Sequence, residues 1–428
     1  MAEQTSKAYR NQVIYSVYVR NHTREGTFEG VRRDLPRIKE LGADVIWLMP
    51  IHPIGEKARK GSLGSPYAIR DYLSVNPEYG TLEDFRRLVD DIHGLGMRCI
   101  IDVVYHHTSP DSLLAGEHPE WFFHKPDGSF GNKVGDWSDI IDLDFTHRGL
   151  WDYLIGALKY WASMVDGFRC DVASLVPLDF WKEARAQVEQ VRPGCLWLAE
   201  TVEPPFISAM RGLGHSCLSD SQAFEAFDIC YEYDVYHTFT ACLKGELPLE
   251  QYARAVSQQE TIYPGNYVKL RYLENHDQPR AAFLIPDSRA LDNWTAFLFF
   301  QKGAALLYGG QEAGDRHLPS LFDRDPVDWS GPDRSRQLRR LCALKKHPLF
   351  TDSVYQVDAL PGEVLRAVHR QGDRQLVGVF SVRGSCVPVP VDAPDGRYEN
   401  LAGEGTVEVK SGMVSCQGYP VIFESGRA

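Results

Sequence analysis

Residues 167–200 read GFRCDVASLVPLDFWKEARAQVEQVRPGCLWLAE, and this stretch decides the fold class. Two short apolar runs, at 167–170 and 195–199, predict buried strands. The segment between them, at 177–190, has the apolar spacing of an amphipathic helix. A strand, a helix and a second strand in this order are typical of a parallel sheet, since parallel neighbours need a crossover connection. The stretch therefore predicts one β-α-β unit.

The same rhythm continues in both directions along the chain. Further strands are predicted at 13–19, 44–49, 98–104, 227–231, 268–273 and 304–308. Further helices are predicted at 30–41, 81–93, 149–164, 204–211, 251–259, 288–300 and 332–345. Eight such units within roughly 345 residues indicate an α/β protein with a (β/α)8 TIM barrel. A doubly wound sheet is the alternative, because strand order cannot be read from the pattern.

The pattern also divides the chain into regions. The barrel is expected to comprise residues 1–104 and 149–347, with an inserted loop subdomain at 105–148 after the third strand. After residue 347 the helical spacing stops, and short alternating runs separated by Gly, Asp and Asn take over. Residues 348–428 are therefore expected to form a C-terminal antiparallel β-sandwich.

Composition excludes several classes of protein. The chain has 428 residues, 43% of them apolar and 24% charged, which is typical of a globular protein. Its net charge of −12 argues against a nucleic-acid or anionic-membrane partner. The nine cysteines form no CxxC pair, so neither a metal site nor a disulfide framework is expected. The first ten residues contain no apolar stretch, and a cytoplasmic location is expected.

Carboxylates follow four of the predicted strands. In a TIM barrel, chemistry takes place at the carboxyl ends of the strands. The acidic residues at these ends are Asp102, Asp171, Glu200 and Asp277. A single Asp or Glu after a strand often caps the next helix. Four at one end of the barrel favour a functional site.

The spacing of two of these acids points to a reaction. Asp171 and Glu200 are one β-α unit apart, so they should end neighbouring strands about 4.8 Å apart. Two carboxyl groups about 5 Å apart suit a retaining glycosidase, in which one attacks and the other transfers the proton. Arg169 lies on the same side of its strand as Asp171 and is expected to keep that carboxylate ionised. Glu200 follows an apolar run, and desolvation there should raise its pKa, as a general acid requires.

At these residues the sequence resembles the α-amylase family, glycoside hydrolase family 13. The resemblance covers roughly residues 10–345 and rests on four motifs in order: DVVYHH at 102–107, GFRCD at 167–171, WLAE at 197–200 and NHD at 275–277. It implies that Asp171 is the nucleophile, Glu200 the acid/base and Asp277 the third catalytic carboxylate.

The resemblance also implies a set of substrate-binding residues. Tyr67 is expected to stack on the sugar, with hydrogen-bonding and charged groups around it: Asp102, His107, Arg169, His276 and Arg280. The family's usual calcium-ligating Asn is replaced by His106, so no metal or other cofactor is expected. The segment VASL at 172–175 lacks the Lys-His pair that binds sugar on the leaving-group side in many members.

The combined interpretation is a retaining α-glucan hydrolase that cleaves α-1,4 bonds of maltooligosaccharides or dextrins. One alternative within the family is an α-glucosidase, a sucrose- or trehalose-converting enzyme, or a transglycosylase. A second alternative is a catalytically inactive barrel that serves as a binding module. The presence of all three catalytic carboxylates favours the enzyme.

Overall fold

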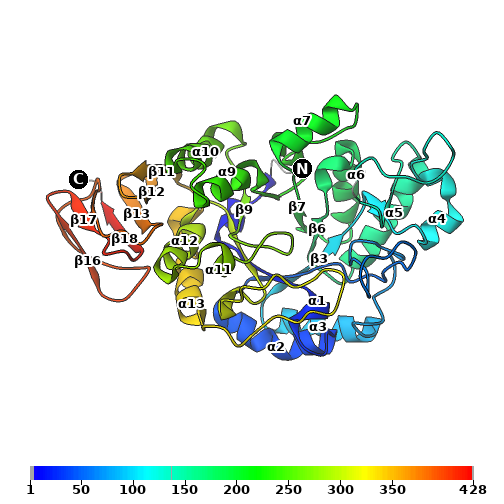
Figure 1. Cartoon of the computed structure of the whole chain (residues 1–428), viewed down its shortest axis with the longest axis horizontal. Helices are drawn as coiled ribbons and strands as arrows, with labels where there is room; N and C mark the ends of the chain where they lie inside the picture. Colours follow the sequence, from blue (N-terminus) through cyan, green and yellow to red (C-terminus); the bar gives the residue numbers. More distant parts are fainter. Residues whose placement is uncertain (1–3, 136, 427–428) are drawn as a thin grey trace.

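Eight parallel strands close into a barrel in the order β1-β10-β9-β8-β7-β6-β3-β2 (Figure 1). The computed structural model describes residues 4–135 and 137–426, so the ends of the predicted regions at 1–3 and 427–428, and residue 136, lie outside it. The barrel strands are β1 (Val13–Val17), β2 (Val45–Leu48), β3 (Arg98–Val103), β6 (Gly167–Cys170), β7 (Leu196–Ala199), β8 (Ile229–Tyr231), β9 (Lys269–Arg271) and β10 (Ala304–Tyr308). The closed barrel confirms the predicted fold and excludes a doubly wound sheet.

Helices cover the outside of the barrel. The longer ones are α2 (Phe28–Leu41), α3 (Leu82–Gly94), α5 (Arg148–Ala162), α6 (Leu178–Val188), α7 (Pro204–Gly212), α9 (Tyr233–Leu243), α10 (Leu249–Ile262), α12 (Ser288–Phe300) and α13 (Ser335–Leu344). Four shorter ones are α1 (Val19–His22), α4 (Leu113–Glu117), α8 (Asp220–Ala223) and α11 (Ala281–Leu284). The predicted helices are present, whereas α9 was not anticipated.

Local sequence explains where these helices begin and end. The Thr81 hydroxyl accepts a hydrogen bond from the Asp84 backbone N–H, and the Asp84 carboxylate accepts one from the Thr81 N–H, a capping box that starts α3. The Thr27 side chain caps α2 at Gly30 in the same way. Helix α2 ends at Gly42, whose φ of 102° suits glycine.

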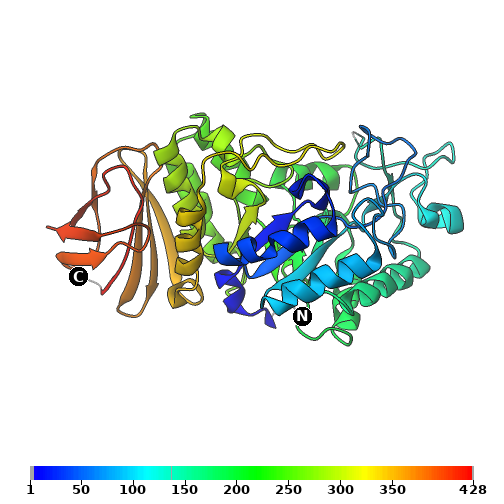
Figure 2. The same ribbon diagram turned by 90° about the horizontal axis from the view of Figure 1, so that it is seen from below.

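The connection between β3 and α5 forms a separate lobe. It contains α4 and a small two-stranded sheet of β4 (His107–Thr108) and β5 (Ile141–Asp142). Figures 1 and 2 both place this lobe at the end of the molecule opposite the C-terminal strands. Because β4 begins four residues after β3, the lobe stands beside the carboxyl ends of the barrel strands.

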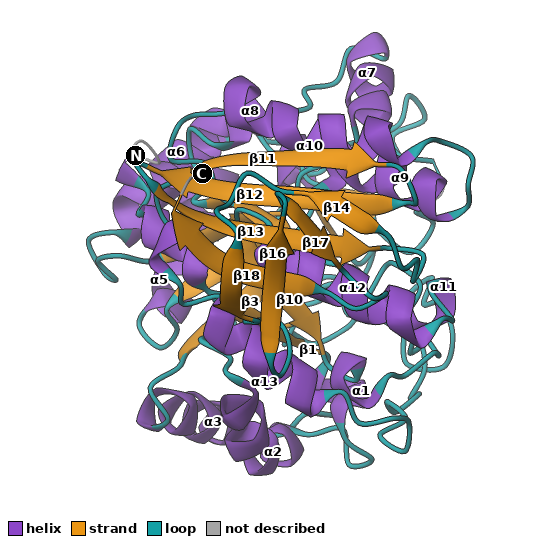
Figure 3. Cartoon of the chain, turned by 90° about the vertical axis from the view of Figure 1, so that its left-hand side faces the viewer, coloured by secondary structure: helices purple, strands orange, loops and turns teal. Residues whose placement is uncertain are grey.

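The C-terminal region consists of two four-stranded antiparallel sheets (Figure 3). One contains β11 (Val354–Leu360), β12 (Val364–Gln371), β13 (Arg374–Ser381) and β18 (Val421–Gly426), and the other β14 (Pro388–Pro390), β15 (Gly396–Glu399), β16 (Thr406–Lys410) and β17 (Met413–Ser415). A core made largely of valines joins the two sheets.

The first of these sheets packs directly on α12. The Phe380 ring on β13 lies 5.3 Å from Phe297 and 5.4 Å from Phe300, measured between ring centroids. Ten of the thirteen residues of α12 are buried, because the barrel covers one side of the helix and this sheet the other. Within residues 4–135 and 137–426, no helix has both the length and the apolar character needed to cross a membrane.

Candidate active site

The barrel register brings the predicted carboxylates to one place. Asp102 on β3 pairs with Arg169 on β6, so the two residues lie side by side. Asp171 directly follows β6, and its N–H donates to the Val103 carbonyl at 2.9 Å. Glu200 directly follows β7, and its N–H donates to the Cys170 carbonyl at 3.0 Å. These backbone hydrogen bonds place Asp171 and Glu200 at the ends of adjacent strands, as the spacing predicts.

Arg169 is the cation at the centre of this group. Its Nη1 donates to Asp102 Oδ1 at 2.9 Å and to Asp171 Oδ1 at 2.7 Å. Its Nη2 lies 2.9 Å from Glu200 Oε2. The guanidinium is fully buried, and it lies over the rings of Trp47 and Tyr231 at 5.3 and 5.4 Å. One cation therefore serves three carboxylates.

Burial dominates the titration of the two central acids. It raises the pKa of Asp171 above the ordinary value, although the Arg169 charge acts in the opposite direction. Burial likewise raises the pKa of Glu200, and the Asp171 charge adds to this effect. The predicted rise for Glu200 is confirmed. Arg169 favours the ionised form of Asp171, as expected, but burial outweighs its effect and the net pKa is raised.

Each of these two acids has one oxygen held and one left unengaged. Among the described residues, only Oδ1 of Asp171 accepts a hydrogen bond, and it does so from Arg169. Glu200 Oε2 accepts the Val172 N–H at 2.8 Å, whereas its Oε1 has no partner within the described chain. Asp171 Oδ2 and Glu200 Oε1 are therefore the atoms left to reach a ligand.

The backbone turns sharply at Val172, immediately after Asp171. Val172 has φ of 40° and ψ of 42°, the left-handed region that β-branched residues rarely adopt. This conformation points its N–H at Glu200 Oε2. Strain of this kind persists where the surrounding structure enforces it, and it is common at functional sites. Nothing in the sequence around 172 signals it.

Tyr67, His276 and Asp277 form the next layer. The Tyr67 hydroxyl donates to Asp102 Oδ2 at 3.1 Å and lies 2.7 Å from His276 Nε2, and the two rings stack at 5.4 Å. The same His276 nitrogen lies 2.9 Å from Asp277 Oδ2. Burial acts to raise the pKa of Asp277, but the charge and hydrogen bond of His276 outweigh it and the pKa is lowered. The Asp277 side chain is 38% exposed, so this carboxylate is open to a ligand.

His107 reaches the site from the inserted lobe. It begins β4, and its ring lies 5.7 Å from Trp137, measured between centroids. Burial lowers the pKa of His107 to about 4, against the opposing effects of Asp139 and the Tyr67 backbone. A neutral imidazole beside the Tyr67 segment can donate or accept a hydrogen bond.

Arg280, which was expected to bind substrate, is held by neighbouring protein groups. Its side chain is fully buried, and its nitrogens donate to the Glu274 carboxylate at 2.7 Å, the Gly309 carbonyl at 2.9 Å and the His317 carbonyl at 3.1 Å. The guanidinium thus joins the segment after β9 to the segment after β10. Asp102 and Arg169 are likewise fully buried, and they support the neighbouring groups.

Two rings beneath the site were not singled out from the sequence. Trp47 on β2 and Tyr231 on β8 point into the barrel and flank Arg169. The sequence offered one indication: both residues lie in predicted barrel strands, where alternate side chains point into the barrel. Apolar strand residues are usually core, however, so this signal is weak.

Taken together, the barrel and its paired carboxylates define a glycoside hydrolase of the TIM-barrel class. The chain matches "Alpha amylase, catalytic domain" over residues 11–138 and 114–339, and "Bacterial Alpha amylase C-terminal domain" over 356–423. It belongs to the α-amylase family, glycoside hydrolase family 13.

Solved structures of relatives extend this comparison. An α-amylase from Lactobacillus plantarum is 46% identical, with a TM-score of 0.96 over 98% of this chain and 100% of that one. A noncanonic maltogenic α-amylase, AmyB, from Thermotoga neapolitana is 32% identical, with a TM-score of 0.86 over 98% and 99%.

Curated relatives are longer than this chain. The α-amylase MalA of Haloarcula japonica is 28% identical, and the match covers 95% of this chain and 61% of that protein. An α-1,4-glucan:maltose-1-phosphate maltosyltransferase from Myxococcus xanthus is 32% identical over 57% of this chain and 38% of that protein. The chain thus spans between about two-fifths and three-fifths of these two proteins.

Proposed function

We propose that this chain is a retaining α-glucan hydrolase that cleaves α-1,4 bonds of maltooligosaccharides and dextrins, in the cytoplasm. The observation that carries the proposal is the pair Asp171 and Glu200, which end adjacent strands and share Arg169. Close carboxyl groups suit retention, because no room is left between them for a water on the opposite face of the sugar.

The two unengaged oxygens support a separate role for each residue of the pair. Asp171 Oδ2 attacks the anomeric carbon while Glu200 Oε1 gives its proton to the departing glycosidic oxygen. The bond to the leaving sugar breaks and a glycosyl ester of Asp171 forms. Glu200, now ionised, then takes a proton from water while the water oxygen attacks the same carbon. The ester bond to Asp171 breaks, which regenerates the carboxylate and releases the product as its α-anomer. Tyr67 stacks on the sugar at this subsite, and His107, His276 and Asp277 bind its hydroxyls.

A transfer reaction is the second candidate, favoured by one observation. Val172 and Val202, which closely follow Asp171 and Glu200 in the chain, pack against an apolar cluster that contains Ile207 and Met210 of α7. An apolar surface there excludes water and leaves the intermediate available to an incoming sugar hydroxyl. Transfer would appear as products longer than the starting oligosaccharide.

Proton NMR with maltoheptaose tests the proposal. We expect new α-anomeric signals first and a ladder of shorter maltooligosaccharides. β-Anomers appearing first would contradict the retaining mechanism. If no α-1,4-oligosaccharide is turned over, the substrate assignment is wrong. The remaining interpretation is then another activity of the family, such as that of a sucrose- or trehalose-converting enzyme.

The plot of activity against pH should be bell-shaped, with its optimum displaced toward higher pH. Below its pKa Asp171 is protonated and cannot attack, and because burial raises that pKa, activity should already fall well above the pH at which ordinary carboxylates protonate. Above the pKa of Glu200 the proton donor is lost. Because the two acids interact, the two limbs report values that belong to the pair.

The measurement is kcat/KM for maltoheptaose from about pH 4 to about pH 9. In Glu200→Gln, assayed with an activated aryl maltoside, we expect the alkaline limb to disappear and the acidic limb to remain. A profile that stays flat down to about pH 4 would contradict a raised pKa for Asp171.

The residues near position 106 do not fit a calcium ion. His106 presents imidazole in place of oxygen, and its Nδ1 lies 3.2 Å from His107 Nδ1. Nearby, Asp139 Oδ1 already pairs with Lys60 Nζ at 2.8 Å. In the described part of the chain, no three His, Cys, Asp or Glu side chains converge as a metal site.

We therefore expect an excess of EDTA to leave both kcat/KM and the unfolding temperature unchanged, as measured in parallel by oligosaccharide assay and differential scanning fluorimetry. A fall in either quantity that added calcium restores would show that the chain binds calcium after all.

A further inference from the structure

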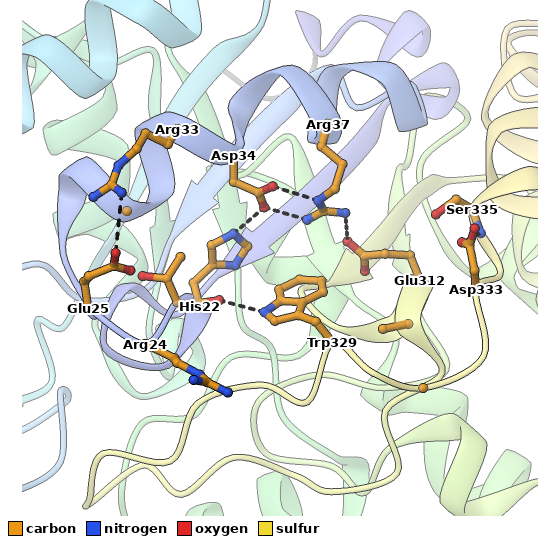
Figure 4. Close-up of a pocket in the computed structure, with 14 residues that line it drawn as sticks. His22, Arg24, Glu25, Arg33, Asp34, Arg37, Glu312, Trp329, Asp333 and Ser335 are labelled. Carbon is orange, nitrogen blue, oxygen red and sulfur yellow. Dashed lines mark hydrogen bonds and ion pairs between the residues drawn. The ribbon is translucent and has the colours of Figure 1, made fainter.

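A cavity lies on the flank of the barrel, away from the carboxylate pair. It has a volume of about 700 Å³ and is lined by α1, the start of α2 and the segment between β10 and α13 (Figure 4). Trp329 lies beside the His22 ring and next to Arg37 of α2. None of the carboxylates Asp102, Asp171, Glu200 and Asp277 lines it.

Trp329 is an exposed aromatic residue held in one orientation. Its side chain is 38% exposed, although tryptophan is normally among the residues most withdrawn from water. Its Nε1 donates to the His22 carbonyl at 3.0 Å, and the His22 ring meets it edge-on at 5.3 Å. The Arg37 guanidinium lies 4.7 Å from the ring centroid. A ring fixed in this way loses little conformational freedom when a ligand packs on it.

The cation that lies over Trp329, Arg37, is also fixed in place. Arg37 donates to Glu312 Oε1 at 2.6 Å and to Asp34 Oδ2 at 2.6 Å, so its guanidinium cannot move far. Arg24 on the rim is exposed and forms no ion pair with any described residue. The cavity therefore offers an apolar ring together with charged donors and acceptors.

The charged side chains that line the cavity limit the class of ligand that it can bind. Three arginines line the cavity against four carboxylates, those of Glu25, Asp34, Glu312 and Asp333. No excess of positive charge is present to hold a phosphate or another polyanion. A neutral ligand with an apolar face and many hydroxyl groups matches both the ring and the mixed polar rim, and a sugar is such a ligand.

The cavity continues toward the C-terminal sheets. Asp333 also lines a neighbouring cavity of about 510 Å³ at the start of α13. That cavity shares Asp292 and Glu404 with a groove of about 1020 Å³ beside β16 and β17. Tyr419, which is 50% exposed, lines this groove, and the Arg289 guanidinium lies 5.2 Å from its ring. Two exposed rings, each beside an arginine, thus lie in a series of three cavities linked by shared lining residues, which is called the depression below.

We propose that this depression binds an α-glucan chain, with Trp329 as the main contact and Tyr419 as a second one. It is a binding surface separate from the carboxylate pair, and it retains polymeric substrate near the enzyme. The choice of α-glucan as ligand rests on the proposed function. The succession of three cavities, two of them with an exposed aromatic ring, favours a polymer over a single sugar.

Native gel electrophoresis with and without amylopectin tests the site. The background is Asp171→Asn, so that the polymer is not consumed during the run. We expect amylopectin to retard this parent, and Trp329→Ala to weaken the apparent affinity roughly fivefold to tenfold, as loss of one aromatic contact implies. Tyr419→Ala should weaken it less. The matched control is Ile262→Ala on α10, which removes another exposed apolar side chain, 57% exposed, outside the depression.

A second readout uses active enzyme. The ratio of amylopectin turnover to maltotriose turnover should fall several-fold in Trp329→Ala, stay at the parent value in Ile262→Ala, and be partly restored in Trp329→Phe. A parent that amylopectin does not retard, or a Trp329→Ala variant retarded equally, would overturn the proposal. Maltoheptaose turnover separately reports on the proposed function, because a chain that binds amylopectin through Trp329 without hydrolysing maltoheptaose would keep this site and lose that function.

Discussion

Substitution of Asp171 by asparagine should abolish hydrolysis of maltoheptaose. An amide oxygen cannot form the glycosyl ester, so we expect kcat/KM to fall by at least about 10⁴-fold, in line with the effect of removing a covalent nucleophile. The variant should still fold, because Arg169 keeps Asp102 and Glu200 as partners. Replacing a buried acid whose pKa is raised removes an unfavourable charge, so the unfolding temperature should stay the same or rise.

The measurement is kcat/KM by product analysis, with differential scanning fluorimetry to establish folding. Asp179→Asn is the matched control, since Asp179 lies in the first turn of α6, downstream of the same strand, and forms no ion pair with the described residues. Residual activity above about one per cent of wild type in Asp171→Asn would identify a different carboxylate as the nucleophile.

Substitution of Glu200 by glutamine should separate two kinds of substrate. In an oligosaccharide the leaving group is a sugar alkoxide, which departs poorly unless Glu200 protonates it. Therefore kcat/KM for maltoheptaose should fall about 10²- to 10⁴-fold. An aryl maltoside with an acidic phenol needs no proton in the first step and should lose less than about tenfold in that step. The raised pKa of Glu200, which burial causes, is what supplies the proton in the wild type.

The two substrates are compared by steady-state and burst kinetics. Because hydrolysis of the ester still needs a base, the aryl maltoside should give a burst followed by slow turnover, and added azide should accelerate the second step. Glu203→Gln, three residues further along at the N-cap of α7, is the control and should behave as wild type. Equal loss on both substrates would contradict the acid role.

The barrel was predictable because most of its strands are short, apolar and buried along their whole length, as in β2 and β7. Helix α9 escaped prediction because its sequence, YDVYHTFTACL, is rich in aromatic and β-branched residues that have low helix propensity. Tertiary burial of its aromatic side chains outweighs that preference.

The carboxylates were predictable because strand ends fix their position, and Asp171 and Glu200 lie where the spacing placed them. Side chains in the irregular segments beyond the strands were harder to place. Arg280, three residues after Asp277, turns into a buried ion pair with Glu274, and no periodicity reveals that direction. The left-handed conformation of Val172 contradicts the preference of its residue type, so the sequence pointed away from it.

The near-complete burial of α12 determines how readily the barrel can be separated from the C-terminal sheets. Phe380 covers the apolar side of this helix, and Asn293 accepts the Ser381 N–H at 2.8 Å and donates to the Gly418 carbonyl at 3.0 Å. The C-terminal sheets thus exclude water from a barrel helix and provide hydrogen-bond partners for the buried Asn293 side chain. The barrel and the sheets therefore share a packed interface, and exchanging either for that of a relative would require redesigning it.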